Sequence, residues 1–123
     1  MMPRTDVRFF RESDGTVPIV DWLELLPRKA EMKCRVKLER LRELGYEIRR
    51  PEADYLRDGI YELRATFGGI HHRLLYCYMG PAAVVVTHGI VKERRVPPRE
   101  IDLAILRKDL VRRDPARHTA EYL

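Results

Sequence analysis

The chain has few cysteines and no long apolar run. Cys34 and Cys77 are too few for a disulfide framework, and both stand among apolar residues, where buried free thiols usually lie. No stretch approaches the roughly 18 apolar residues that a membrane span needs. The start, MMPRTDVRFF, lacks the apolar region of a signal peptide. We therefore expect a cytoplasmic protein with no role in a membrane.

Internal repeats, low-complexity tracts and interdomain linkers are also missing from the sequence. Hydrophobic residues make up 45% of the chain and charged residues 35%, which is typical of a globule with a charged surface and excludes a disordered chain. A length of 123 residues suits one core. We therefore predict a single domain over residues 1–123.

Positive charge is concentrated in two blocks. The net charge is +5, and residues 28–50 alone carry nine basic and four acidic side chains. Residues 92–123 carry nine basic and six acidic side chains. Such blocks suit phosphate binding, but solvated basic helices also occur in proteins that bind no nucleic acid. Charge alone leaves both interpretations open.

The first half of the chain predicts a strand and two helices. Residues 7–10 are β-branched and aromatic, as in a short strand, and a turn follows at residues 13–15. Pro18 suits a first helical turn, and Pro27 ends that helix. A second helix over residues 28–44 ends at Gly45. Its apolar stripe consists of Ala30, Cys34, Leu38, Leu41 and Leu44.

The second half predicts a meander and a last helix. After a linker-like stretch at 49–54, alternating residues predict antiparallel strands over 60–66, 70–79 and 83–88. Pro98 begins a helix, and the tail after Pro115 is expected to fray. The predicted class is α+β, with an N-terminal strand, a two-helix hairpin, a three-stranded antiparallel meander and a C-terminal helix.

Alternation along the strands brings charged residues to one face. Glu62 and Arg64 share a face of their strand, and Arg73 on the next strand can join Arg64 across the pair. His88 is expected to continue the face of Val84 and Val86 into a turn at Gly89. The prediction is therefore a pair of clustered guanidinium groups, unless Glu62 and Arg64 form only a surface ion pair.

Several segments, in this order, resemble the HigB-type, phage-related branch of the RelE/ParE toxin superfamily. They are PIVDWL at 18–23, LRDGIYELR at 56–64, HRLLY at 72–76, THGIVKE at 87–93, and Pro97 followed by Glu100-Ile101. The resemblance implies a RelE-like fold and the toxin of a type II toxin–antitoxin system. It also implies an endoribonuclease that cuts messenger RNA on the ribosome, and a helix-turn-helix, HigA-like antitoxin that forms a hetero-oligomer with it.

RNA cleavage suits the predicted cluster, because fixed arginines stabilise the charge that develops when a 2′-hydroxyl attacks phosphorus. The reaction needs neither metal nor cofactor. The resemblance matches Arg64 and Arg73 to basic strand positions, and Lys92 to the basic residue after the last strand. RelE has a lysine in place of Glu62 and a catalytic tyrosine that residues 96–99 lack. The base and the acid therefore remain open among Glu62, His71, His88 and Lys92.

The predicted catalytic set is Arg64, Arg73, Lys92, Glu62 and His88. The predicted RNA-binding residues are His71, Arg94, Arg95, Arg35 and Arg42. Two other functions remain open, because one fold can host several activities. One is a ParE-like inhibitor that blocks a topoisomerase without cutting RNA, and the other is an inactive relative that only binds nucleic acid.

Overall fold

A computed structural model describes residues 4–91 and 94–122 of the chain. In chain order its elements are β1 (Asp6–Phe10), α1 (Pro18–Leu25), α2 (Arg28–Leu44), the 3-10 turn η1 (Gly45–Glu47), β2 (Ala53–Arg57), β3 (Ile60–Phe67), β4 (Ile70–Tyr78), β5 (Ala83–Val91), α3 (Pro98–Arg113), α4 (Pro115–His118) and β6 (Thr119–Glu121). Both predicted N-terminal helices and the C-terminal helix are present. None of the described helices is long and apolar enough to cross a membrane.

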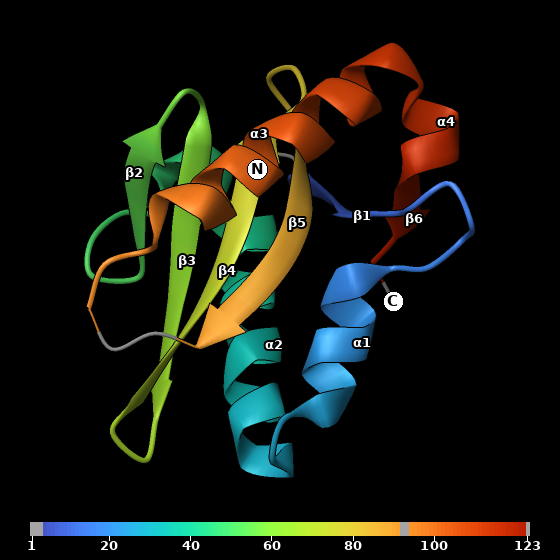
Figure 1. The fold of residues 1–123 in the computed structure, drawn as a ribbon. Helices are drawn as coiled ribbons and strands as arrows, with labels where there is room; N and C mark the ends of the chain where they lie inside the picture. Colours follow the sequence, from blue (N-terminus) through green and yellow to red (C-terminus); the bar gives the residue numbers. More distant parts are fainter. Residues whose placement is uncertain (1–3, 92–93, 123) are drawn as a thin grey trace.

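The described strands form one mixed sheet of six, in the order β2-β3-β4-β5-β1-β6 (Figure 1). Strands β2 to β5 form an antiparallel meander. Strand β1 joins the sheet parallel to β5, and β6 pairs antiparallel with β1. The α+β class is confirmed, but the sheet is larger than the sequence predicted.

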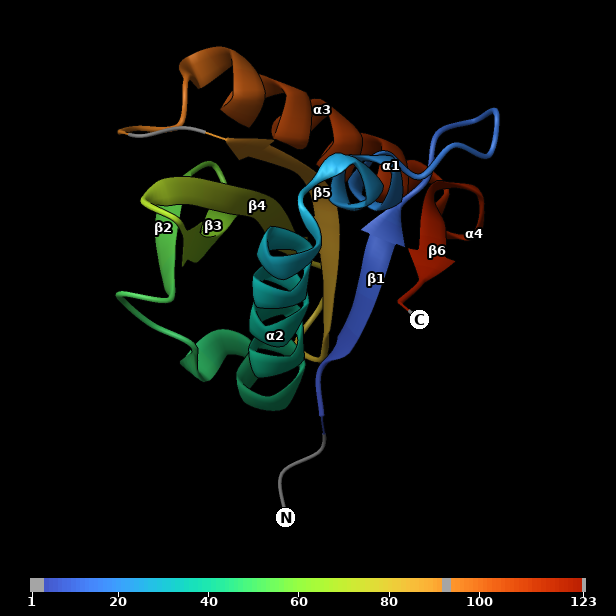
Figure 2. The ribbon, with the colours of Figure 1, turned by 90° about the horizontal axis from the view of Figure 1, so that it is seen from below.

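Helices cover both faces of the sheet. Figure 2 shows β4 and β5 lying between α2 on one side and α3 on the other. The core against α1 and α2 includes Leu23, Leu38 and Leu63. The core against α3 includes Leu75 and Ala104. Because successive residues of a strand point to opposite faces, β3 and β4 contribute to both cores.

The prediction of a linker-like stretch at 49–54 is wrong at its end, because strand β2 begins at Ala53. The meander therefore has four strands instead of three, because β2 pairs antiparallel with β3 and places Asp54 beside Glu62. Asp58 and Gly59 join the two strands with φ values of 52° and 82°. An Asp-Gly pair is a strong hairpin signal. The alternation of apolar and polar residues does not reveal β2, because β2 is a short edge strand without a clear two-residue pattern.

The prediction that the tail frays after Pro115 is wrong. The side chain of Asp114 accepts a hydrogen bond from the Arg117 N–H at the start of α4, and β6 then pairs with β1. The ring of Tyr122 lies 5.3 Å from that of Phe9. These contacts depend on a strand more than a hundred residues away, so the local sequence could not reveal them.

Two glycines have conformations or contacts that other residues would not allow. Gly45 ends α2, as predicted, with a φ of 55° that favours glycine. Gly89 was predicted to form a turn but lies inside β5, where the indole ring of Trp22 occupies the space that a Cβ would need. This close approach lets α1 lie directly on β5.

The predicted face of His88 is also wrong. Leu75 pairs with His88 while the next residue, Tyr76, pairs with Val86, so Thr87 is an extra residue in β5. This bulge moves His88 to the α3 side of the sheet, away from the face that holds Val86. Alternation counted from Val84 and Val86 fails because a bulge shifts the pattern by one residue.

Candidate functional site

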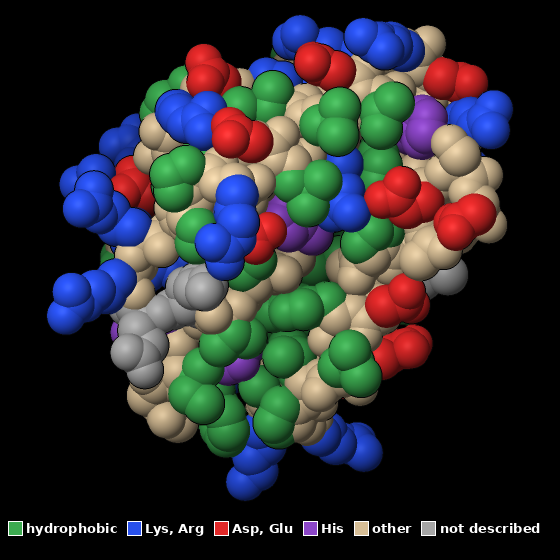
Figure 3. Space-filling model, in the orientation of Figure 1, with side chains coloured by type: hydrophobic (Ala, Val, Ile, Leu, Met, Phe, Trp, Pro, Cys, Tyr) green, Lys and Arg blue, Asp and Glu red, His purple; other side chains and the backbone are tan. Residues whose placement is uncertain are grey.

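A groove of about 1210 Å³ lies on the α3 side of the sheet, at the end that carries β2. We call it the basic groove. It is lined by Lys33 and Lys37 of α2, residues 51, 52 and 54–57 in and before β2, Glu62, Arg64 and Thr66 of β3, His71 and Arg73 of β4, residues 94–98 and Ile101. Seven lining side chains are lysines or arginines and three are carboxylates, so the groove favours an anion. Figure 3 shows basic side chains along this side of the molecule.

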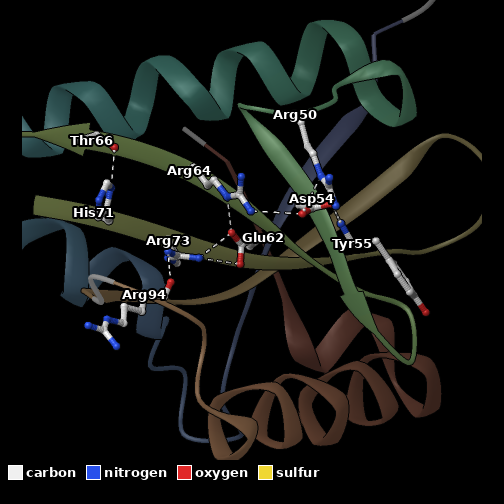
Figure 4. Close-up of polar contacts among 9 residues, drawn as sticks. All are labelled: Arg50, Asp54, Tyr55, Glu62, Arg64, Thr66, His71, Arg73 and Arg94. Atoms are coloured by element: carbon white, nitrogen blue, oxygen red, sulfur yellow. Dashed lines mark hydrogen bonds and ion pairs between the residues drawn. The ribbon is translucent and has the colours of Figure 1, made fainter.

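A buried carboxylate holds two arginines in the floor of the groove. Glu62 is 1% exposed, and both of its oxygens accept hydrogen bonds from Arg73 Nη1, at 2.8 and 3.1 Å. Arg64 Nε donates to Oε1 of the same carboxylate. We call this group the Glu62 clasp (Figure 4). A surface ion pair is therefore excluded, because the carboxylate is shielded from water.

Strand pairing explains the clasp. Arg64 and Arg73 are direct partners across β3 and β4, and Glu62 precedes Arg64 by two residues on the same face. This is the arrangement that alternation predicted. Arg73 is the more enclosed arginine, with 11% of its side chain exposed against 36% for Arg64. Leu75, on the same face as Arg73, is fully buried, as the sequence also indicated.

A chain of ion pairs extends from the clasp toward the edge of the sheet. Arg64 Nη2 lies 3.3 Å from Asp54 Oδ2 on β2, and the same carboxylate lies 3.0 Å from Arg50 Nε. The hydrogen bond from Arg50 and the nearby charge of Arg64 lower the pKa of Asp54. At the other end, Arg73 donates to the backbone oxygen of Arg94. Figure 4 shows the contacts from Arg50 to Arg94 as one network.

A second carboxylate ties α2 to the groove. Glu52 accepts hydrogen bonds from Lys37 at 3.1 Å and from Arg40 at 2.9 and 3.0 Å. The hydrogen bond from Arg40, followed by that from Lys37, lowers the pKa of Glu52 to about 2. The carboxylate therefore stays charged at neutral pH. It holds the basic face of α2 against the segment that leads into β2.

Three of the predicted RNA-binding residues line the groove. Arg94 and Arg95 are exposed and line it. His71 is also exposed at the groove, and its Nδ1 lies 3.1 Å from Thr66 Oγ1 on the neighbouring strand. Lys92, which the sequence placed in the catalytic set, lies outside the described residues.

His88 is not among the residues that line the groove. Its Nδ1 lies 3.0 Å from Thr87 Oγ1, and its Nε2 lies 3.5 Å from a carboxylate oxygen of Glu100 on α3. Burial, together with the positive charge of Arg107, lowers the pKa of His88 to about 4. The ring is therefore neutral at pH 7 and lies between the sheet and α3.

The two predicted α2 arginines do not line the groove either. Arg35 pairs with Glu31 at 2.9 Å, and Arg42 stacks on the ring of Tyr122 at 5.7 Å. The residues of α2 that line the groove are Lys33 and Lys37. They are four positions apart and thus lie on one face of the helix. The sequence shows that α2 is basic, but only the packing of α2 shows which basic residues face the groove.

The arrangement can bind a phosphodiester and stabilise added negative charge on it. Arginines held by a buried carboxylate need little reorganisation when charge develops nearby. Among residues 4–91 and 94–122, no group of three or more His, Cys, Asp and Glu side chains has the geometry of a metal site. Cys34 and Cys77 are both buried free thiols, as the sequence indicated.

The fold and the groove together define a small basic α+β protein with a carboxylate-braced pair of arginines on a sheet. A family model described as "Phage derived protein Gp49-like (DUF891)" matches residues 21–109. The chain therefore belongs to the Gp49-like family, which is part of the HigB/RelE-like toxin group. No curated protein sequence matches the chain. The matched range includes the helix α2, the Glu62 clasp and most of α3.

Proposed function

We propose that this protein is the toxin of a type II toxin–antitoxin system and that it cuts messenger RNA on the ribosome. The observation that carries the proposal is the Glu62 clasp, which presents Arg64 and Arg73 in the floor of a basic groove. A groove of this charge suits an RNA backbone, whose phosphates dominate protein–nucleic acid affinity. Membership of the Gp49-like family supports the toxin class.

The proposed reaction is a transesterification within the RNA. The 2′-hydroxyl oxygen attacks the adjacent phosphorus while the bond from phosphorus to the 5′-oxygen breaks. A base takes the 2′-hydroxyl proton, and an acid gives a proton to the departing 5′-oxygen. The products are a 2′,3′-cyclic phosphate and a 5′-hydroxyl. The phosphorane gains negative charge on the way, and fixed guanidinium groups stabilise it.

We assign the charge stabilisation to Arg64 and Arg73 and the positioning of both to Glu62. His71 is exposed at the groove on the same face of β4 as Arg73, so its imidazole suits proton transfer. Lys92 remains a further candidate. We leave His88 out of the reaction, because it lies beneath α3 and does not line the groove.

The proposed partners are the ribosome with its messenger and a helix-turn-helix antitoxin. Binding of the antitoxin would hold the toxin inactive in a hetero-oligomer. The alternative within the same superfamily is a ParE-like inhibitor that blocks a topoisomerase. The two differ in one observable, which is whether messenger RNA is cut.

The test is a cell-free translation reaction in which messenger 5′ ends are mapped by primer extension. We expect cuts with the purified protein, and no cuts when ribosomes are omitted and RNA alone is supplied. Arg73→Ala should lower cleavage by roughly a hundredfold or more, as loss of one group that stabilises a transition-state oxyanion does. Circular dichroism checks that the variant is folded. Intact messenger with the folded wild-type protein would refute the nuclease and favour topoisomerase inhibition.

A further inference from the structure

A second hollow of about 470 Å³ lies beside the basic groove, at the free edge of β2. We call it the edge hollow. It is lined by Ile48, Arg49, Arg50, Ala53, Asp54, Tyr55 and Tyr61. Asp54 and Tyr55 line both the edge hollow and the basic groove, so the two spaces meet at β2.

Tyr55 offers an aromatic ring at this junction. It is 53% exposed, although tyrosines usually bury most of their ring. Its ring centre lies 5.0 Å from that of Tyr61 in an edge contact, and Tyr61 in turn stacks on the buried Tyr76. The Tyr55 hydroxyl accepts a hydrogen bond from the Gly59 N–H at 3.1 Å. The ring is therefore held in place at both ends while much of its surface stays open to solvent.

Two arginines line the same hollow as the Tyr55 ring. Arg49 and Arg50 are both exposed, and Arg50 has 77% of its side chain in solvent. Asp54 lies between Arg50 of the edge hollow and Arg64 of the Glu62 clasp, so a line of alternating charges connects the two spaces. In Figure 4, Tyr55 points away from Glu62 and beyond the edge of β2. An open ring next to arginines that continue a basic groove suits an unpaired nucleotide better than a peptide strand.

We propose that the edge hollow binds a flanking nucleotide of the RNA strand that occupies the basic groove, with its base stacked on Tyr55 and its phosphate held by Arg49 and Arg50. The inference rests on the proposed function and extends it, because it gives the RNA a path that crosses β2 and a binding site outside the reacting nucleotides. Stacking accepts any base, so this site adds affinity without choosing a sequence.

The test compares the binding of a short and a long RNA. The probes are an oligouridine trinucleotide and a nonanucleotide, both 2′-O-methylated so that they cannot be cut, with affinity measured by fluorescence anisotropy. Loss of one stacked base lowers affinity by roughly fivefold to a hundredfold. We expect Tyr55→Ala to weaken the nonanucleotide within that range and to leave the trinucleotide unchanged. Tyr55→Phe keeps the ring and should bind the nonanucleotide like the wild type.

Two further variants separate this proposal from the proposed function. Arg73→Ala should weaken both RNAs, because it removes a charge from the groove itself. Tyr46→Ala is the matched control, since Tyr46 is 70% exposed but lines neither space. If Arg73→Ala weakens binding and Tyr55→Ala does not, the edge hollow does not bind a nucleotide. RNA binding in the basic groove is then still supported. If the wild-type protein binds neither RNA, the nucleotide site at the edge hollow is refuted, while the translation reaction above still decides the proposed function.

Discussion

Replacing Glu62 with glutamine should strongly destabilise the fold, because it removes the charge of a buried carboxylate that lies between two arginines. Taking one partner from a buried ion pair costs about 3 to 5 kcal/mol, since a charge is left without compensation. Arg73 has only 11% of its side chain exposed, so water screens it poorly. Arg64 is 36% exposed and keeps Asp54 as a partner. We therefore expect the lower end, about 3 kcal/mol, for Glu62→Gln.

A double-mutant cycle tests whether this cost comes from the ion pair. Arg73→Met alone should also destabilise, but the double variant Glu62→Gln/Arg73→Met removes both charges together. The double variant should lose about 2 kcal/mol less free energy of unfolding than the two single variants lose together.

The assay is urea unfolding at neutral pH, followed by the fluorescence of Trp22, which is the single tryptophan of the chain. The matched control is Glu31→Gln, because Glu31 pairs with Arg35 at the surface of α2 with 28% of its side chain exposed. This change should cost at most about 1 kcal/mol. If Glu62→Gln is no more costly than Glu31→Gln, the clasp does not stabilise the fold as described.

Two other predictions concern the packing of β5. Gly89→Ala should lower the free energy of unfolding in urea by about 1 to 3 kcal/mol, because the added Cβ would overlap the rigid indole of Trp22. The control is Gly68→Ala, which lies at an open turn and should show only the strain of its positive φ. The pKa of His88 is lowered to about 4 from about 6.5 in an unfolded chain, so the unfolded state binds more protons between these values. The free energy of unfolding should therefore fall as the pH drops through this window, by on the order of 3 kcal/mol from His88 alone, and His88→Gln should remove that part of the slope; an equal slope in the variant would contradict the assignment.

The clasp could be predicted because its geometry follows from local rules. Glu62 and Arg64 share a face by the two-residue period of a strand, and the Phe67-Gly68-Gly69 turn sets β4 opposite β3. The burial of Glu62 could not be predicted, because it depends on segments distant in sequence that close over the sheet. A charged residue in an alternating strand is otherwise expected to face water.

The wrong predictions for His88 and for the arginines of α2 concern how whole elements pack against one another. The bulge at Thr87 turns His88 toward α3, and no local signal marks it. The charge of Arg35 and Arg42 predicts RNA contact, but the face of α2 that packs toward the groove carries Lys33 and Lys37 instead. Tyr55 is absent from the predicted site because it lies in β2, whose one sequence signal is the Asp-Gly pair that follows it.

The sequence by itself determined the class of the fold, the two N-terminal helices, the central strands and the pairing of Arg64 with Arg73. These features depend on residue periodicity, on helix and turn signals, and on contacts between neighbouring strands. Only the tertiary structure decided that Glu62 is buried, that β6 pairs with β1 at one edge of the sheet, and that the groove continues into the edge hollow. Such features arise where segments far apart in the chain exclude water together, and burial of that kind is a property of the assembled surfaces.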